Sequence, residues 1–335
     1  MSDKKLLVVF GATGTQGSSV VTHVLSTPSL SSKFSVRAIT RNTTSPAAQT
    51  LAAKGAELVS ADLDSAPTLA PAVEGAHAVF LATISVYDEK LRAREVAQGK
   101  NVVDAAVAAG VEQFIFSSLT NTLPFREKGV VNKEAQEEVK GVTFLDHFDG
   151  KAEVEAYAKT LPIKTAFFAP AGFMQNFETN QAPRSVSEDG NTWALFNWIS
   201  PSAPAPLIET AADAGKYITP ALLEPDKYDG KFFAAASELL TYAQIAEKMT
   251  ASLKGTKYEG KKVVYQQIPK QVMEGFMPSP MGGYIVDMFG WIEGWGYYGP
   301  GGEEQVRWTR EQVEGAGGKL TGFEEYLEKN PLVLE

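Results

Sequence analysis

The chain has 335 residues, 44% of them apolar, and its 31 Lys and Arg residues against 40 Asp and Glu residues give a formal net charge of −9. This length is too great for one small domain and too short for three, and the acidic balance argues against nucleic acid as a direct partner, because binding to phosphates requires a basic surface. The chain has no cysteine, which excludes disulfides, thiolate nucleophiles and cysteine-bound metals, and its histidines show no metal-ligand spacing, so we expect no metal.

A glycine-rich turn follows the first predicted strand. The apolar run Leu6–Phe10 is typical of a strand buried on both faces, and glycines then follow in G-x-x-G-x-x-G spacing as a helical pattern begins. In a dinucleotide-binding loop such glycines allow a sharp turn, the approach of a pyrophosphate to the backbone, and close packing of the helix on the sheet. The N–H groups and the dipole of that helix then face the phosphates. An ordinary glycine-rich turn is the alternative, but we predict that a dinucleotide is bound by Gly11, Thr13, Gly14, Thr15, Gln16 and Gly17.

The first half of the chain alternates between strand-like and helix-like patterns. After the first strand, further strands are predicted over residues 34–40, 56–61, 78–83, 113–118 and 164–168. Helices are predicted through residues 20–25, 46–54, 69–74, 88–109, 128–140 and 151–159, the last with Asp149 as its N-cap. Strands that alternate with helices imply a parallel, doubly wound sheet with right-handed crossovers. We therefore predict an α/β fold built on a Rossmann-type sheet.

The second half of the chain is less regular. Residues 172–206 are rich in Pro, Ser and Asn, and we predict that they form loops over a binding cleft. A helix is predicted over 210–223 and a strand over 231–236, and capping boxes that begin at Thr241 and Thr321 precede two further helices. Apolar residues at helical spacing predict one more helix, whose stripe packs in a core, at Tyr284, Met288, Trp291 and Trp295.

These patterns divide the chain into two predicted parts. The Rossmann domain comprises residues 1–170 with return segments within 207–237, and a smaller substrate or partner lobe comprises residues 171–206 and 238–335. No apolar run approaches the roughly 18 residues of a membrane span, and the first residues lead directly into a strand, without room for a signal peptide. We therefore expect a cytoplasmic protein, with a nuclear location also open, that has no membrane partner.

Several segments together resemble the NmrA-like family, an atypical branch of the short-chain dehydrogenase/reductase superfamily. The matching segments are Gly11–Gly17, Val36–Asn42, Ser117–Asn121, His147–Lys151 and Ala171–Phe177, with a weaker match at Thr210–Gly215. The resemblance implies a Rossmann fold that binds NADP(H). The family includes redox-sensing regulators that bind NADP without obvious turnover, and it resembles true reductases of the isoflavone-reductase and quinone-reductase kind, so both functions stay open at this point.

The end of the second strand indicates which dinucleotide is bound. NAD-specific sites place an acidic residue there for the ribose hydroxyls, whereas a nearby Arg suits a 2′-phosphate. Here no acid follows the strand, and a guanidinium can hold a phosphate through two hydrogen bonds; in the family, the position of Arg41 contacts the 2′-phosphate region. A solvated surface arginine is the alternative. We predict preference for NADP(H), with contacts from Arg37, Arg41 and Asn42.

The other cofactor contacts are predicted at the carboxyl ends of the strands, where a doubly wound sheet binds its ligand. The resemblance places the corner after the third strand against the adenine, and the segment after the sixth strand should close over the nicotinamide. For each of these residues, an ordinary role in a turn or in loop packing is the alternative. The predicted contacts are Asp62, Leu63, Thr83, Ile84, Ser85, Ser117, Pro170, Phe173 and Asn176.

The superfamily's catalytic pair, Tyr-x-x-x-Lys, corresponds here to His147 and Lys151. We predict that Lys151 anchors the nicotinamide ribose or acts as a general base; an exposed lysine is the alternative. His147 is either a proton relay, because imidazole titrates near neutrality, or a structural residue. Tyr87 and Tyr157 could also supply a phenol, although neither has the motif spacing.

Two functions follow from these observations. The retained lysine and the aromatic second lobe favour an NADP(H)-dependent reductase of a small aromatic, carbonyl or quinone-type molecule. The missing tyrosine favours the alternative, a non-catalytic NADP(H) sensor that regulates a protein partner such as a transcription factor.

Overall fold

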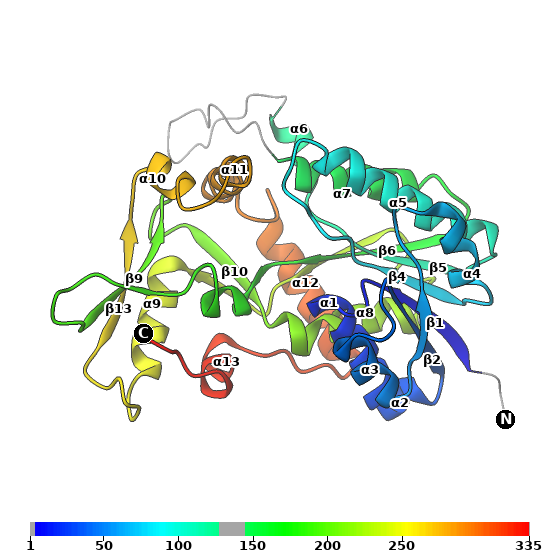
Figure 1. The fold of residues 1–335 in the computed structure, drawn as a ribbon, viewed down its shortest axis with the longest axis horizontal. Helices are drawn as coiled ribbons and strands as arrows, with labels where there is room; N and C mark the ends of the chain where they lie inside the picture. Colours follow the sequence, from blue (N-terminus) through cyan, green and yellow to red (C-terminus); the bar gives the residue numbers. More distant parts are fainter. Residues whose placement is uncertain (1–3, 127–144, 335) are drawn as a thin grey trace.

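A seven-stranded, all-parallel sheet forms the larger part of the molecule, in the order β11-β6-β5-β4-β1-β2-β3 (Figure 1). The computed structural model describes residues 4–126 and 145–334, so the helix predicted over 128–140 lies outside the described residues. The strands of this sheet are β1 Lys5–Phe10, β2 Phe34–Thr40, β3 Glu57–Ser60, β4 Ala78–Leu81, β5 Gln113–Ser117, β6 Lys164–Pro170 and β11 Lys231–Ala235. This arrangement confirms the predicted α/β, Rossmann-type fold.

Helices cover both faces of this sheet, as the apolar run of β1 requires. Leu7 and Val9 pack with α1, α8 and α12 on one face, and Val8 and Phe10 pack with α4, α5 and α7 on the other, because alternate side chains of a strand point to opposite faces. The helices of this part are α1 Thr15–Ser26, α2 Pro28–Ser31, α3 Pro46–Ala53, α4 Leu69–Val73, α5 Leu91–Ala108, α6 Leu123–Arg126, α7 Asp146–Ala158, α8 Thr210–Leu223 and α12 Gly302–Gly315, with a short 3₁₀ turn, η1, at Ala66–Thr68.

A second, smaller part has its own hydrophobic core and lies beside the carboxyl edge of the large sheet (Figure 1). It holds two three-stranded sheets, in the orders β12-β10-β7 and β13-β9-β8. Their strands are β7 Gly172–Phe173, β8 Arg184–Ser185, β9 Thr192–Asn197, β10 Pro204–Ile208, β12 Glu238–Thr241 and β13 Lys262–Gln267. The helices of this part are α9 Tyr242–Ser252, α10 Lys270–Glu274, α11 Met281–Trp295 and α13 Phe323–Lys329, with a 3₁₀ turn, η2, at Met174–Glu178.

The structure corrects the prediction that residues 172–206 are irregular, because they contain four strands, β7 to β10. Two of these strands pair with segments far away in sequence: Pro204 lies opposite Thr241, and Thr192 lies beside Lys262. Short strands with prolines resemble loops when their sequence is considered alone. Helix α12 differs from the predicted division as well, since Val306 and Val313 pack in the core of the large sheet.

The predicted helix starts are partly confirmed. Thr241 and Gln244 form a capping box, in which Thr241 Oγ1 accepts from the Gln244 N–H at 3.2 Å and Gln244 Oε1 accepts from the Thr241 N–H at 2.9 Å. The box predicted at Thr321 is wrong, because its N–H and hydroxyl donate to the buried Asp213 instead. The N-cap predicted at Asp149 is also wrong, since α7 begins at Asp146, one turn earlier.

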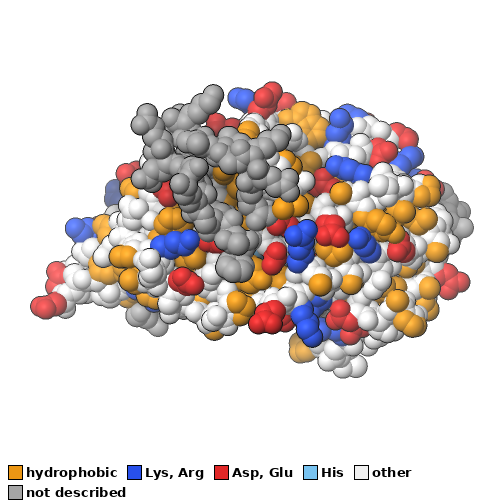
Figure 2. Space-filling view, turned by 90° about the horizontal axis from the view of Figure 1, so that it is seen from above, with side chains coloured by type: hydrophobic (Ala, Val, Ile, Leu, Met, Phe, Trp, Pro, Cys, Tyr) orange, Lys and Arg blue, Asp and Glu red, His pale blue; other side chains and the backbone are white. Residues whose placement is uncertain are grey.

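The distribution of charge and the hydropathy of the helices complete the description of the fold. On the face seen in Figure 2, basic and acidic side chains are interspersed over the described residues. Within residues 4–126 and 145–334, no helix is long and apolar enough to cross a membrane.

Candidate functional site

The glycine loop after β1 lies at the point where the strand order reverses, between β1 and β4. Gly11 has a φ of +69°, and a Cβ there would lie 2.6 Å from the Ala82 carbonyl oxygen. A Cβ on Gly17 would lie 2.2 Å from the Gly11 carbonyl oxygen, so both positions require glycine for the fold of the loop itself. Gly14 differs, because a Cβ there would approach only one atom, the Gly11 carbonyl oxygen, at 3.3 Å. The space above Gly14 is therefore open to a ligand.

The N-terminus of α1 faces this open space and has the properties of an anion site. Gly14 is its N-cap, no side chain caps the helix, and its first turn contains no acidic residue. Thr13, Gly14 and Thr15 are exposed. Unsatisfied N–H groups and the positive end of the helix dipole favour a phosphate at such a position. The residues of the predicted phosphate loop therefore fit the pyrophosphate of a dinucleotide.

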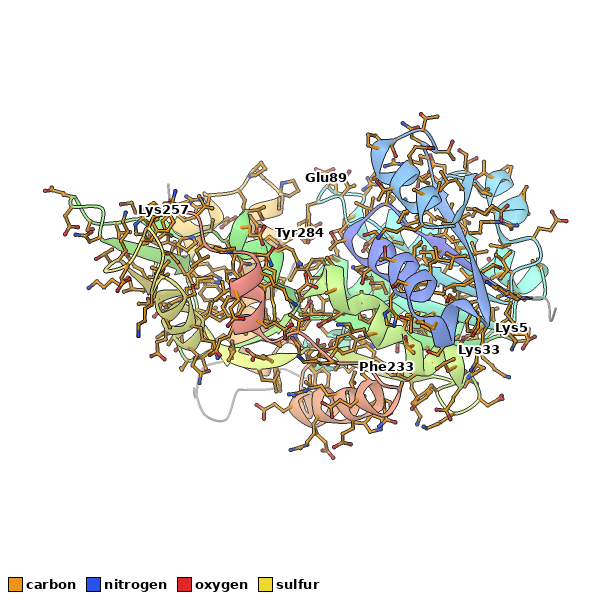
Figure 3. The ribbon with its side chains drawn as sticks, turned by 90° about the horizontal axis from the view of Figure 1, so that it is seen from below. Lys5, Lys33, Glu89, Phe233, Lys257 and Tyr284 are labelled. Atoms are coloured by element: carbon orange, nitrogen blue, oxygen red, sulfur yellow. The ribbon has the colours of Figure 1, made fainter. Side chains whose placement is uncertain are left out.

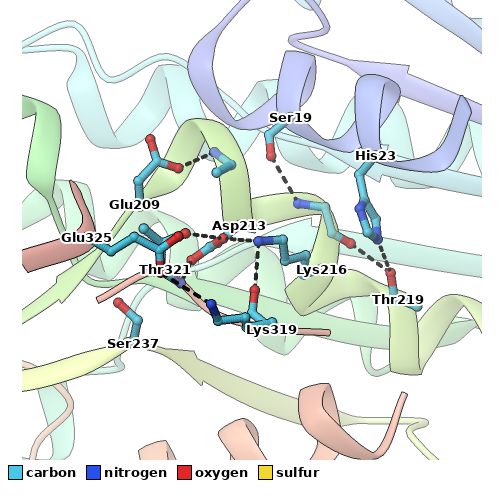
Figure 4. Close-up of polar contacts among 12 residues, drawn as sticks. Ser19, His23, Glu209, Asp213, Lys216, Thr219, Ser237, Lys319, Thr321 and Glu325 are labelled. Atoms are coloured by element: carbon cyan, nitrogen blue, oxygen red, sulfur yellow. Dashed lines mark hydrogen bonds and ion pairs between the residues drawn. The ribbon is translucent and has the colours of Figure 1, made fainter. Parts of the chain in front are cut away.

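Helix α8 packs against α1 on the same face of the sheet, and polar contacts join the two helices (Figure 4). The Gly215 N–H donates to Ser19 Oγ at 3.2 Å, and His23 Nε2 lies 3.1 Å from Thr219 Oγ1. A Cβ on Gly215 would lie 2.4 Å from His23 Cβ, so only glycine permits this approach. The segment Thr210–Gly215, which matches the family only weakly, thus supports the helix that faces the phosphates.

The structure separates the two arginines predicted at the second strand. The Arg37 guanidinium donates to Glu57 Oε2 at 2.9 Å and to the carbonyl oxygens of Ala72 and Glu74 at 3.1 and 2.8 Å. These bonds join β2 to β3 and α4 away from the strand end, so Arg37 is a structural residue and we no longer predict a phosphate contact for it. Arg41 is exposed just beyond β2, and its guanidinium has no hydrogen-bond or ion-pair partner among the described residues. Arg41 is therefore available to a phosphate.

The neighbouring loops are shaped by their own side chains. Asn42 Oδ1 accepts from the N–H and the hydroxyl of Thr44 at 2.9 and 2.8 Å, and Asp62 Oδ1 accepts from the Asp64 N–H at 3.1 Å. Leu63 is half-buried against the core that α4, α5 and α7 form on one face of the large sheet. By contrast, Ile84 is 63% exposed immediately after β4. A flat ring of a ligand that packed on this exposed apolar side chain would bury it from water, which is favourable.

Lys151 lies at the centre of a buried polar network. Its ammonium donates to Thr83 Oγ1 at 2.7 Å and to the Ser117 carbonyl oxygen at 3.4 Å, and it forms an ion pair with Glu95 Oε1 at 3.4 Å. These partners come from the ends of β4 and β5 and from α5. The Ser117 hydroxyl in turn donates to Gln16 Oε1 in the glycine loop at 2.6 Å. The lysine that the sequence predicted as a ribose anchor therefore lies at the same edge of the sheet as the phosphate loop.

Glu95 is the site residue that our sequence analysis missed. Its carboxylate is 1% exposed and accepts at Oε1 from Thr83 and from Ser85, at 3.2 and 2.9 Å, while Oε2 has no partner among the described residues. Glu95 meets Lys151 because a side-chain-free Gly99, one turn later on α5, lets that helix pack against Val154 of α7. The available signal was an acidic residue on the buried stripe Leu91, Glu95, Gln98 and Val102.

His147 is buried among aromatic rings. The rings of Phe148, Tyr87 and Tyr284 have their centroids 4.9, 5.6 and 6.3 Å from that of His147, and neither ring nitrogen has a hydrogen-bond partner among the described residues. Burial, with a smaller contribution from the charge of Lys151, lowers the pKa of His147 to about 3. The imidazole is therefore neutral at pH 7 and has no proton to donate as an imidazolium. Of the two roles that the sequence left open for His147, these contacts favour the structural one over the proton relay.

A cavity of about 450 Å³ opens between the carboxyl edge of the sheet and α11, and Tyr87, two residues after Ser85, is among its lining residues. Figure 3 shows the junction of the two parts, with Glu89 and Tyr284 on its two sides. Four of the seven methionines of the chain line the cavity, and thioethers adapt to apolar ligands of varied shape. The predicted residues Phe173 and Asn176 lie in its wall, and Pro170 precedes them at the end of β6. The only charged group among the described lining residues is Arg184, whose guanidinium lies 5.0 Å from the Phe276 ring centroid.

Comparison with known sequences gives one family. The model of the NmrA-like family matches residues 3–327 of the chain. A relative from Penicillium ochrochloron, the NmrA-like family domain-containing oxidoreductase ptmS, is 32% identical over 283 residues, which are 79% of this chain and 76% of that protein.

Comparison with solved structures gives the same fold with two kinds of function. NmrA, a negative transcriptional regulator in complex with NADP, matches with a TM-score of 0.72 at 23% identity and covers 98% of both chains. The triphenylmethane reductase of Citrobacter sp., complexed with NADP(H), matches with a TM-score of 0.68 at 20% identity and covers 97% of this chain and 99% of its own. At these identities the likeness concerns the fold alone, so the function has to be argued from the site.

Proposed function

This chain belongs to the NmrA-like family, and we propose that it is an NADP(H)-dependent reductase of a small apolar molecule that carries an aromatic, carbonyl or quinone-type group. The observation that carries the proposal is the largely apolar cavity of about 450 Å³ at the edge of the sheet that fits a dinucleotide, whose lining residue Tyr87 contacts His147, one turn before Lys151 on α7. A regulator that only senses the cofactor would not need an apolar cavity of this size there. Enclosed apolar cavities with few polar groups are typical of small-molecule sites.

Each part of the site has a proposed role. The glycine loop and the N-terminus of α1 hold the pyrophosphate, and Arg41 and Asn42 receive the 2′-phosphate. Thr83, Ile84, Ser85 and Ser117 border the cofactor along the carboxyl edge, while Lys151 holds the nicotinamide ribose. When bound, NADPH supplies a hydride equivalent to an electrophilic carbon. Phe173 and Asn176 then form the wall that keeps the substrate against the nicotinamide and excludes water.

The alternative function, a sensor that regulates a protein partner, stays a prediction that one assay decides. Wild-type protein is mixed with NADPH and a panel of quinones, enones, aromatic aldehydes and cationic dyes, and the loss of absorbance at ~340 nm is followed. We expect substrate-dependent oxidation of NADPH with at least one apolar acceptor. A panel without turnover, together with partner binding that differs between NADP⁺ and NADPH, would favour the sensor, because only differential binding shifts a population.

Cofactor preference provides a separate prediction. A ligand present at ~100 times its Kd stabilises the folded state by ~2.7 kcal/mol, so thermal melting compares the two dinucleotides directly. We expect a larger shift with NADPH than with NADH. Arg41 has no partner among the described residues, and no acidic residue follows β2 at the place where NAD-specific sites carry one. Arg41→Ala should reduce the NADPH shift to the size of the NADH shift. Arg307→Ala, which removes an exposed arginine of α12, should leave both shifts unchanged; equal shifts in the wild type would contradict the preference.

A further inference from the structure

We propose that Tyr87 is the catalytic residue that binds the reducible group of the substrate and donates the proton to it. This inference rests on the proposed reductase function and extends it to the acid of the reaction. Reduction of a carbonyl needs a proton as well as a hydride. The position that holds the superfamily's tyrosine is His147 here, which is neutral and buried. With Lys151 assigned to the nicotinamide ribose, we look for the proton donor among the residues that line the cavity.

Only one phenol in the described wall of the cavity has a free hydroxyl. The described lining residues with an O–H group are Tyr87, Tyr242 and Tyr297. Tyr297 donates to the Pro170 carbonyl oxygen at 2.9 Å, and Tyr242 has a side-chain hydrogen bond with Asn197. The Tyr87 hydroxyl has no hydrogen-bond partner among the described residues. The lining amides, such as Asn176, can donate a hydrogen bond but are far too weak as acids to give up a proton.

Tyr87 is also held at the cofactor end of the cavity. It follows β4 on the segment that carries Thr83 and Ser85, and its ring lies edge-on against His147, with centroids 5.6 Å apart. His147 precedes Lys151 by one turn of α7. On the other side, the Tyr284 ring of α11 lies 5.8 Å from that of Tyr87, centroid to centroid. The buried His147 ring therefore packs against the phenol of Tyr87 and fixes its position. This packing gives a structural role to an imidazole whose nitrogens have no hydrogen-bond partner among the described residues.

The hydride and the proton go to different atoms of the carbonyl group. The carbonyl carbon receives the hydride equivalent that NADPH supplies, and NADPH becomes NADP⁺. The π pair of the C=O bond moves to oxygen, which takes the proton from the Tyr87 hydroxyl. The resulting phenolate is neutralised by a proton from water. Burial, and to a lesser degree the charge of Glu95, raises the pKa of Tyr87 to about 12, so the phenol carries its proton at pH 7.

The first test is kinetic and uses an acceptor that the wild-type protein reduces. We expect Tyr87→Phe to lower kcat by ~10² to 10⁴, the usual contribution of a general acid, with the KM for NADPH unchanged. The matched control is Tyr157→Phe on α7. It removes a hydroxyl that donates to the exposed Asp104 of α5, and it should leave turnover unchanged. Circular dichroism and the NADPH-induced melting shift show whether Tyr87→Phe remains folded. Wild-type turnover in the folded variant overturns the proposal.

The second test does not depend on turnover. Binding of benzophenone and of diphenylmethane, which lacks the carbonyl oxygen, is measured by quenching of tryptophan fluorescence. We expect the wild type to prefer benzophenone by about fivefold, the effect of one hydrogen bond, and Tyr87→Phe to lose this preference. The same preference in both proteins overturns the assignment of Tyr87. If the wild type reduces no acceptor at all, the proposed function fails, and the benzophenone comparison alone decides whether Tyr87 binds a carbonyl oxygen.

Discussion

Gly14→Val is expected to abolish dinucleotide binding and to leave a folded protein. Gly14 has a φ of −82° and a ψ of 169°, an extended conformation that valine adopts readily. A Cβ there would approach only the Gly11 carbonyl oxygen, at 3.3 Å, so the isopropyl group points into the open space above the helix N-terminus. That space is where the pyrophosphate has to reach the backbone N–H groups. Titration calorimetry with NADPH measures the loss, and circular dichroism checks the fold.

Two other glycines serve as controls for this experiment. Gly17→Val should lose stability as well as binding, because its Cβ would lie 2.2 Å from the Gly11 carbonyl oxygen. Gly315→Ala, at the end of α12 with nothing within 4 Å of the added Cβ, should change neither. If Gly14→Val bound NADPH with wild-type affinity, the phosphates would have to lie elsewhere and the proposed function would lose its foundation.

Lys151→Met is expected to lower turnover by at least ~99% and to lower the affinity for NADPH by less than tenfold. Methionine keeps the length of the side chain and removes the charge that we propose holds the nicotinamide ribose. Orientation of the nicotinamide matters steeply for hydride transfer, since the reacting atoms must be held in near-attack geometry. Because the proposed phosphate site is the glycine loop, most of the binding energy should remain. Steady-state kinetics and NADPH titration of the same preparation separate the two effects.

The structure shows why this variant needs a partner substitution. Lys151 is the ion-pair partner of Glu95, whose carboxylate is 1% exposed, and loss of one member of a buried pair costs roughly 3–5 kcal/mol. The double variant Lys151→Met with Glu95→Gln removes both charges and should recover much of the stability without recovering turnover. Lys159→Met is the matched control at the C-terminal end of the same helix, because that lysine is exposed and, among the described residues, its one ion pair is with Glu155. Recovery of turnover in the double variant would show that the lysine acts only through stability.

The sequence alone predicted the parts of the fold whose signals are local. The apolar run of β1, the glycine spacing after it and the alternation of strands and helices each depend on neighbouring residues, and they predicted the parallel sheet and its phosphate loop. The capping box at Thr241 is confirmed for the same reason, since both of its hydrogen bonds join residues three apart. The rule that a doubly wound sheet binds its ligand at the carboxyl ends of its strands also needs no knowledge of contacts, and it led to Thr83 and Ser117. Lys151 came instead from the resemblance to the Tyr-x-x-x-Lys motif.

What the tertiary structure decided depends on residues far apart in sequence. The strands of 172–206 form because β9 and β10 pair with β13 and β12, and no local pattern encodes those partners. The pairing of Glu95 with Lys151 depends on the contact of α5 with α7 at Gly99. Likewise, Arg37 and Arg41 look alike in the sequence, but only the fold shows that one is bonded to β3 and α4 while the other is free. Side chains gain their chemistry from burial and partners, and both are set when distant segments pack together.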